Sequence, residues 1–275
     1  MRLKNKNSYL KINNIKTKKI INNISEPIRY CPSVFGFSKR ATGRKVKISL
    51  LDSGCPSHKI IDIPLTATSF CSNELAVKDN NGHATVVSGI MVADCVRKIR
   101  GFVPNADVYY AKVVDQYGKC RFNSLLAGVL WSIVQDVDII VIPIGTTFNY
   151  EVLHSAILKA VKNNICIVAA SGDNIKKENG KLEYPAAYTE VFSASSLPKK
   201  KKIKNRVLSK IDFAINTFNT ISTYMDNKYI KVSGSSIATA FIASQAALEI
   251  QKQKKNKSDK ISPIEVYKKM IKKNK

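Results

Sequence analysis

Three short segments of the chain each place a reactive side chain beside glycine or other small residues. In the first, Leu51–Gly54 (LDSG), Asp52 follows an apolar run. A carboxylate that ends a buried strand loses its hydration and therefore needs a polar partner. The plainer interpretation of the same residues is an ordinary exit from a strand into a turn.

The second segment is Asn81–Gly89 (NGHATVVSG), where His83 stands at the mouth of a predicted helix. An imidazole can act as a general base when a carboxylate holds its other ring nitrogen. A helix-terminal histidine with a structural hydrogen bond is the alternative. Of the other two histidines, we expect His58 to be structural and His154 to lie on the surface.

The third segment is Ser233–Ala240 (SGSSIATA), which places Ser236 at the start of a predicted helix after a glycine. A serine there can expose its hydroxyl, while the free backbone N–H groups of the first helical turn surround an oxyanion. Taken alone, the segment is better explained by simple helix capping by serine.

The elements that must position these residues alternate regularly from Lys45 onward. Near-continuous runs of Val, Ile and Leu predict strands, and amphipathic or small-residue runs predict helices. We expect strands at 45–51, 107–114, 138–144, 165–170 and 191–195, and helices at 84–96, 123–135, 151–162 and 236–250. Asn123 or Ser124 could cap the second of these helices.

Apolar strands separated by helices predict an α/β fold, a doubly wound and mostly parallel sheet with helices on both faces. Active sites of such sheets lie at the carboxyl ends of the strands. We expect one folded α/β domain over residues 26–251. A basic, flexible segment (1–25) would precede it, and a basic, partly helical tail (252–275) would follow.

Taken together and in this order, the three segments resemble the signature blocks of the subtilisin-like serine proteases, the subtilase family. The pattern is D-S-G, then G-H-A-T-x-x-S-G, then G-S-S-I-A-T-A. The order Asp, His, Ser differs from that of chymotrypsin-like enzymes and α/β-hydrolases. The resemblance extends from about Gly43 to Ile250 and implies hydrolysis of peptide bonds.

The resemblance also implies roles for individual residues. Ser236 would attack the peptide carbonyl, His83 would move the proton, and Asp52 would orient His83 and stabilise its imidazolium form. An extended substrate would pair with one segment as an added strand. That segment comprises Ile142, Pro143, Ile144 and Gly145, and one wall of the pocket for the residue before the cut comprises Ala170, Ser171 and Gly172.

The position that donates to the oxyanion departs from the family pattern. The family has asparagine there, whereas this chain has Asp173 followed by Asn174. An ionised carboxylate would repel the oxyanion that an amide stabilises. Three explanations remain open: a protonated Asp173, a one-residue shift to Asn174, or a slow and specialised enzyme.

Other departures from the family are smaller. Ala84, Pro143 and Ala240 replace a glycine, a serine and a proline of the family pattern. The acidic loops that bind calcium in secreted subtilisins are not recognisable, so we expect no required metal and no cofactor. No full pro-domain and no secretory signal are expected before the first core strand.

A compact subtilase without those segments resembles the intracellular peptidases that remove leader peptides from lanthipeptide precursors. A general intracellular subtilisin is the alternative, and a peptide-binding pseudoprotease impaired by Asp173 is a further one. We expect a monomer in the cytoplasm, with a peptide or protein as its substrate and no membrane span.

The composition is compatible with this interpretation. Among the 275 residues, 45 Lys and Arg oppose 20 Asp and Glu, giving a net charge of +25, concentrated at the two ends and in Lys199–Lys202. The basic runs lack interleaved aromatics and match no nucleic-acid motif, so we expect no specific nucleic-acid binding. The six scattered cysteines form no C-x-x-C pair, which indicates reduced thiols.

Overall fold

The computed structural model describes residues 9–11, 20–21, 41–62, 66–72, 76–95, 98–173, 181–197, 211–256 and 258–273. Asn174, the run Lys199–Lys202 and most of the segment 1–25 therefore lie outside the described residues. Among the described residues, no helix is both long and apolar enough to cross a bilayer.

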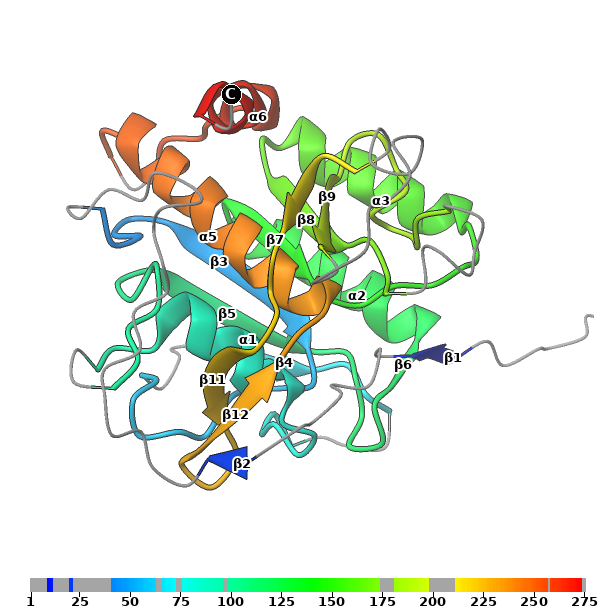
Figure 1. Cartoon of the computed structure of the whole chain (residues 1–275). Coiled ribbons are helices and arrows are strands. Elements are labelled where there is room, and N and C mark those ends of the chain that lie inside the picture. The colour runs from blue at the N-terminus through cyan, green and yellow to red at the C-terminus, as the bar shows by residue number, and fades with distance from the viewer. Residues whose placement is uncertain are drawn as a thin grey trace, which may run out of the picture.

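A seven-stranded parallel sheet forms the centre of the molecule (Figure 1). Every pairing in it is parallel, and the strand order is β10-β9-β8-β7-β3-β5-β4. The predicted α/β sheet is confirmed. Its strands are β3 (Lys47–Asp52), β4 (Thr66–Ser69), β5 (Asp107–Lys112), β7 (Ile139–Ile142), β8 (Cys166–Ala170), β9 (Phe192–Ser196) and β10 (Phe213–Ile215).

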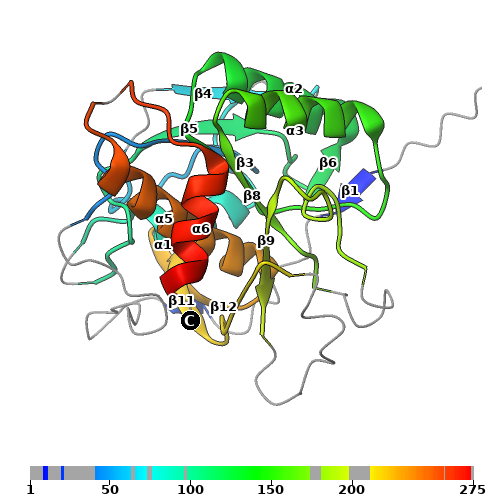
Figure 2. The same cartoon turned by 90° about the horizontal axis from the view of Figure 1, so that it is seen from above.

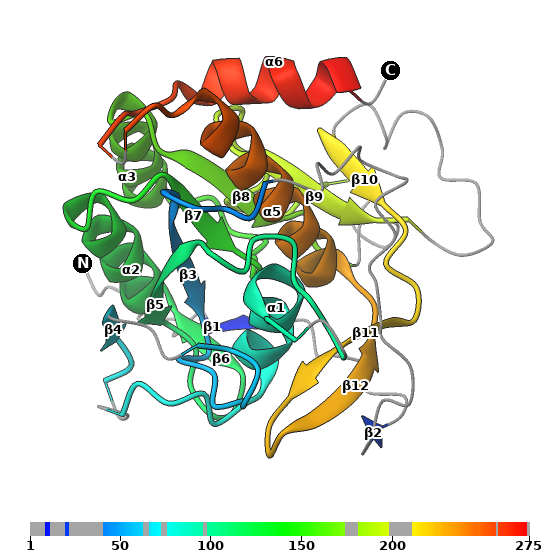
Figure 3. The same ribbon diagram turned by 90° about the vertical axis from the view of Figure 1, so that its left-hand side faces the viewer.

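Helices cover both faces of this sheet, as Figures 2 and 3 show from two further directions. On one face α1 (His83–Val92) and α5 (Ser235–Gln253) pack on alternate strand residues such as Leu50 and Val141. On the other face α2 (Phe122–Val134) and α3 (Glu151–Lys162) pack on the intervening residues such as Leu51 and Ile140. This alternation along the strands makes two separate apolar layers.

Two smaller sheets lie beside the central one. The first pairs β1 (Tyr9–Lys11) with β6 (Lys119–Arg121) in antiparallel fashion. The second has the order β11-β12-β2 and comprises β11 (Thr220–Tyr224), β12 (Lys228–Val232) and β2 (Ile20–Ile21). Strand β11 packs against α1.

The segment after α5 folds back onto the domain. Helix α6 (Pro263–Lys273) packs on α5 and buries Val266 and Met270 in the core (Figure 3). Lys254 is also buried, and its Nζ lies 2.7 Å from Asp138 Oδ2. The amphipathic spacing of the apolar residues explains why this lysine-rich segment can pack as a helix.

Some expected helix ends differ from the structure. The first helix ends at Val92 instead of residue 96, because Ala93 has extended backbone angles and its carbonyl accepts the N–H of Gly101. Neither Asn123 nor Ser124 caps α2. The Ser124 hydroxyl instead donates to the carbonyl of Phe70, 2.8 Å away.

Candidate active site

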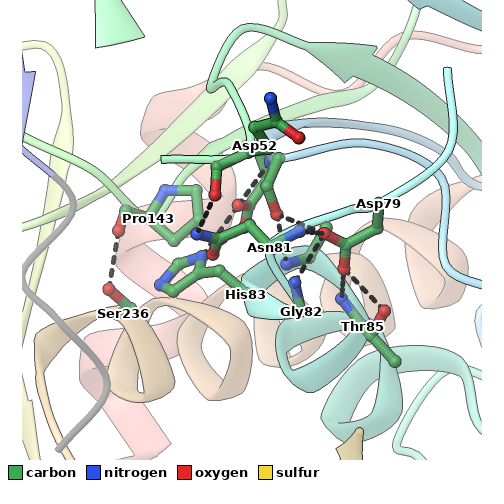
Figure 4. A network of polar contacts seen from close by, with 11 residues as sticks. Asp52, Asp79, Asn81, Gly82, His83, Thr85, Pro143 and Ser236 are labelled. Carbon is green, nitrogen blue, oxygen red and sulfur yellow. Dashed lines mark hydrogen bonds and ion pairs between the residues drawn. The ribbon is translucent and has the colours of Figure 1, made fainter. Parts of the chain in front are cut away.

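Asp52 and His83 meet at the carboxyl edge of the sheet. Asp52 is the last residue of β3 and His83 is the first of α1, and both are almost fully buried. His83 Nδ1 lies 2.7 Å from Asp52 Oδ1 and 2.8 Å from Oδ2 (Figure 4). A carboxylate can only accept, so Nδ1 carries the proton and Nε2 remains free to act as a base.

The surroundings of His83 favour its protonated form. Burial by itself would lower the pKa of His83, but the charge and hydrogen bond of Asp52 outweigh it. The charges of Asp79 and Asp173 add to this effect, and the pKa ends above its usual range. His83 can therefore take a proton from a neighbouring hydroxyl and hold it.

Asp79 holds the start of α1 in place, a role that the sequence analysis missed. Its Oδ1 accepts the N–H groups of Asn81 and Gly82 and the hydroxyl of Ser53, at 3.0, 2.7 and 2.9 Å. Its Oδ2 accepts the N–H and hydroxyl of Thr85, at 2.8 and 2.6 Å. Figure 4 shows this cluster directly beside His83. One buried carboxylate thus satisfies N–H groups at the helix start and fixes the backbone that carries the imidazole.

Ser236 lies in the first turn of α5, and Figure 4 places its side chain on the opposite side of the His83 ring from Asp52. Its hydroxyl donates to the carbonyl oxygen of Pro143 at 2.6 Å. In the described part of the chain, the buried Nε2 of His83 has no hydrogen-bond partner. The structure thus brings the three expected residues together, with the serine hydroxyl turned away from the base.

The start of α5 offers backbone donors beside that hydroxyl. The first four N–H groups of a helix have no partner within it, and Ser236 is the second residue of α5. Gly234 precedes the helix with a φ of 139°. This helix start carries the positive end of the helix dipole, and the Ser236 N–H can stabilise the oxyanion that a substrate carbonyl would form beside it.

Asp173 contacts the same helix start, as an acceptor. Its Oδ1 accepts the backbone N–H of Ser235 at 2.7 Å, and a methyl group on Gly234 would lie 2.9 Å from its Oδ2. The carboxylate of Asp173 therefore lies at the helix start, where the side-chain amide of the family asparagine would donate to the oxyanion. Of the alternatives that the sequence left open, the shift to Asn174 falls outside the described residues.

The two expected substrate-binding segments flank this arrangement. Ile142 still belongs to β7 and pairs with Ala169, whereas Pro143, Ile144 and Gly145 follow the end of that strand. Ala170 ends β8 and leads into Ser171 and Gly172. All seven residues are buried.

The remaining candidates have structural contacts. His154 pairs with Glu190 at 3.1 Å and stacks on Tyr188. His58 is buried and packs edge-on against Tyr229. Within the described ranges there is no group of three His, Cys, Asp or Glu side chains that could hold a metal, and the five described cysteines are unbridged.

The sequence of this chain is similar to those of known proteases. The profile of the subtilase family matches residues 43–274. The minor extracellular protease Epr of Bacillus subtilis is 37% identical over 75% of this chain, which spans 32% of Epr. The major intracellular serine protease of Bacillus subtilis is 28% identical over 91% of this chain and 82% of its own length.

The intracellular serine protease of Paenibacillus polymyxa is 27% identical over 94% of this chain and 82% of its own length. A base held by a buried carboxylate, a serine at a helix start and a family match over most of the chain thus agree with one another. This chain belongs to the subtilase family and is a subtilisin-like serine protease.

Proposed function

We propose that this protein hydrolyses peptide bonds as an endopeptidase, with Ser236 as nucleophile, His83 as base and Asp52 as the residue that orients the base. The observation that carries this proposal is the short contact between His83 Nδ1 and Asp52 Oδ1, 2.7 Å in a buried site. It orients the ring so that Nε2 is directed toward Ser236 (Figure 4).

Each step follows from groups at the site. The Ser236 hydroxyl leaves the Pro143 carbonyl and gives its proton to His83 Nε2 as its oxygen attacks the substrate carbonyl. The backbone N–H groups at the start of α5 receive the oxyanion. His83 then gives the proton to the leaving amine, and water releases the acyl group by the same route in reverse.

We propose further that the enzyme works inside the cell on a narrow set of substrates, such as the leader of a lanthipeptide precursor. Two relatives that align over more than nine-tenths of this chain are named intracellular serine proteases. The carboxylate of Asp173 disfavours a fast, general oxyanion site. The net charge of +25 would attract an acidic leader over a distance set by the ionic strength.

A direct comparison of substrates tests this narrow specificity. Purified protein is incubated with casein and with a panel of lanthipeptide precursors, and cleavage is followed by mass spectrometry. The proposal predicts a single cut at the leader boundary of one or a few precursors and little digestion of casein. Rapid digestion of casein would instead indicate a general intracellular protease.

A second candidate is a peptide-binding protein that does not cleave. It is favoured by two contacts, the Ser236 hydroxyl on Pro143 O and the Asp173 carboxylate at the helix start. Binding of precursor peptides at micromolar concentration, with no cleavage and no labelling of Ser236 by a serine-directed probe, would favour this candidate.

A further inference from the structure

Glu183 lies between the two segments that flank the start of α5. A methyl group placed on Gly145 would come within 2.5 Å of Glu183 Oε2, and one on Gly172 within 2.7 Å of Oε1. Both carboxylate oxygens therefore face glycine backbone, one on each side. No side chain longer than hydrogen fits at either glycine while Glu183 keeps this position.

The backbone around Glu183 is fixed to the same two segments. The Glu183 N–H donates to the carbonyl of Ser171 at 3.1 Å. The next residue, Tyr184, exchanges two hydrogen bonds with Thr146, at 2.9 and 2.7 Å. The backbone of Glu183 and Tyr184 thus connects the two segments by hydrogen bonds.

Both flanking segments also contact the nucleophile's helix. Pro143 accepts the Ser236 hydroxyl, and Gly145 lies two residues further along the chain. Asp173 accepts the N–H of Ser235, and Gly172 lies just before it. In the proposed reaction, a substrate attacked by Ser236 would lay the residue before the cut against these segments, with its side chain directed toward Glu183.

We infer that Glu183 selects substrates with lysine or arginine immediately before the cleaved bond. This inference rests on the proposed function and adds its substrate class. An ammonium or guanidinium group would make charge-assisted hydrogen bonds with the carboxylate between two walls of backbone. An apolar side chain would displace water from the carboxylate without donating hydrogen bonds in its place. An acidic side chain would be repelled by the carboxylate.

Glu183 also lines an open groove. Glu183 is half-buried and borders an open groove of about 550 Å³, whose other lining residues include the exposed Lys181. A carboxylate offers about four lone-pair positions, so a substrate cation can bind alongside donors of the protein. The chain as a whole carries +25, so its overall charge cannot supply a preference for basic residues, and the local carboxylate must do so.

The test uses quenched-fluorescent peptides that differ only in the residue before the cut: Lys, Arg, Gln, Leu, Ala or Glu. For the unaltered enzyme, kcat/KM with Lys or Arg is expected to exceed that with Gln or Leu at least 10-fold. Glu183→Gln should abolish this preference for Lys and Arg, and Glu183→Asp should retain part of it. The ratio of kcat/KM values for two peptides does not depend on the fraction of enzyme that is folded.

The matched control is Glu265→Gln, the same change on exposed α6, which should leave the ratio unaltered. A preference for Leu or Ala in the unaltered enzyme would overturn the inference, because the carboxylate would then merely fill the pocket. Labelling of Ser236 by a fluorophosphonate, run in parallel, separates the two claims. Labelled enzyme without a basic preference refutes the role of Glu183 alone, whereas an enzyme that neither labels nor cleaves refutes the proposed function as well.

Discussion

The hydroxyl of Ser236 donates to the carbonyl oxygen of Pro143, 2.6 Å away, while the Nε2 atom of His83 has no partner among the described residues. The groups that we propose as base and nucleophile thus lie in one site but are not hydrogen-bonded to each other. For reaction the hydroxyl must leave the Pro143 carbonyl and turn toward Nε2. Catalytic hydrogen bonds often tighten only when substrate is present, so the geometry is compatible with activity.

Replacing Asp52 with asparagine should nearly abolish activity. The amide can offer its N–H to His83 Nδ1, which would then place the proton on Nε2, where it blocks the base. We expect kcat to fall about 10⁴-fold, with a smaller change in KM. The measurement is steady-state cleavage of a peptide substrate. Asp226→Asn, the same change at an exposed turn, is the control. A loss of less than 10-fold would show that His83 does not depend on Asp52.

Asp79→Ala should lower both stability and turnover. It leaves five donors without their acceptor at the start of α1. We expect the free energy of unfolding to fall by about 2 kcal/mol or more, measured by urea denaturation.

Turnover should fall in Asp79→Ala even where the variant is fully folded, because α1 carries His83. Asp94→Ala is the control, since Asp94 forms an exposed ion pair with Arg100 at 3.3 Å, and such pairs contribute about 0–1 kcal/mol. Equal effects of the two substitutions would contradict the role given to Asp79.

Asp173→Asn should raise activity. The asparagine oxygen can still accept the Ser235 N–H, while its amide gives the oxyanion a donor in place of a charge. One such donor is worth about 10²–10³ in rate, a range measured on a subtilisin. A fall in kcat would contradict the proposed position of the oxyanion.

The pH dependence of the Asp173→Asn variant gives a second readout. The charge of Asp173 is one of the causes that raise the pKa of His83. Without that charge the imidazole loses its proton at lower pH, so the rising limb of kcat/KM should move to lower pH. A shift to higher pH would show that Asp173 does not favour imidazolium.

Gly89→Ala should destabilise the contact between α1 and β11. Its methyl group would lie 2.1 Å from Thr223 Oγ1 and 2.5 Å from Ser222 Oγ. Both hydroxyls donate to carbonyls of α1, so neither can move without losing a bond. We expect a loss of about 1–3 kcal/mol. The double variant with Thr223→Ala should recover part of it, and strictly additive losses would argue against this contact.

The sequence predicted the sheet because its strands are near-continuous apolar runs. The meeting of Asp52 and His83 was expected from the resemblance to the subtilase blocks, and the end of β3 and the start of α1 do share the carboxyl edge of the sheet. The end of α1 was misplaced by apolar residues such as Val96. They continue the helical pattern, whereas α1 ends at Val92 and the carbonyl of Ala93 accepts the N–H of Gly101.

Asp79 and Glu183 escaped the sequence analysis for a common reason. Asp79 accepts mainly from backbone N–H groups of the nearby helix start, and Glu183 packs against the distant Gly145 and Gly172; hydrophobic periodicity reveals neither kind of contact. An aspartate three residues before Gly82 is a weak signal of helix capping that could have identified Asp79. The orientation of the Ser236 hydroxyl is a choice among rotamers, which the sequence does not encode in any pattern.

The central claim is that Ser236 is an activated nucleophile, and labelling with a fluorophosphonate tests it most directly. Ser235→Ala is the matched control, because it removes a neighbouring hydroxyl from the same helix turn. The account predicts labelling of the unaltered protein and of Ser235→Ala, and its loss in Ser236→Ala and His83→Ala. Folded protein that is not labelled, or label that persists in Ser236→Ala, would contradict it.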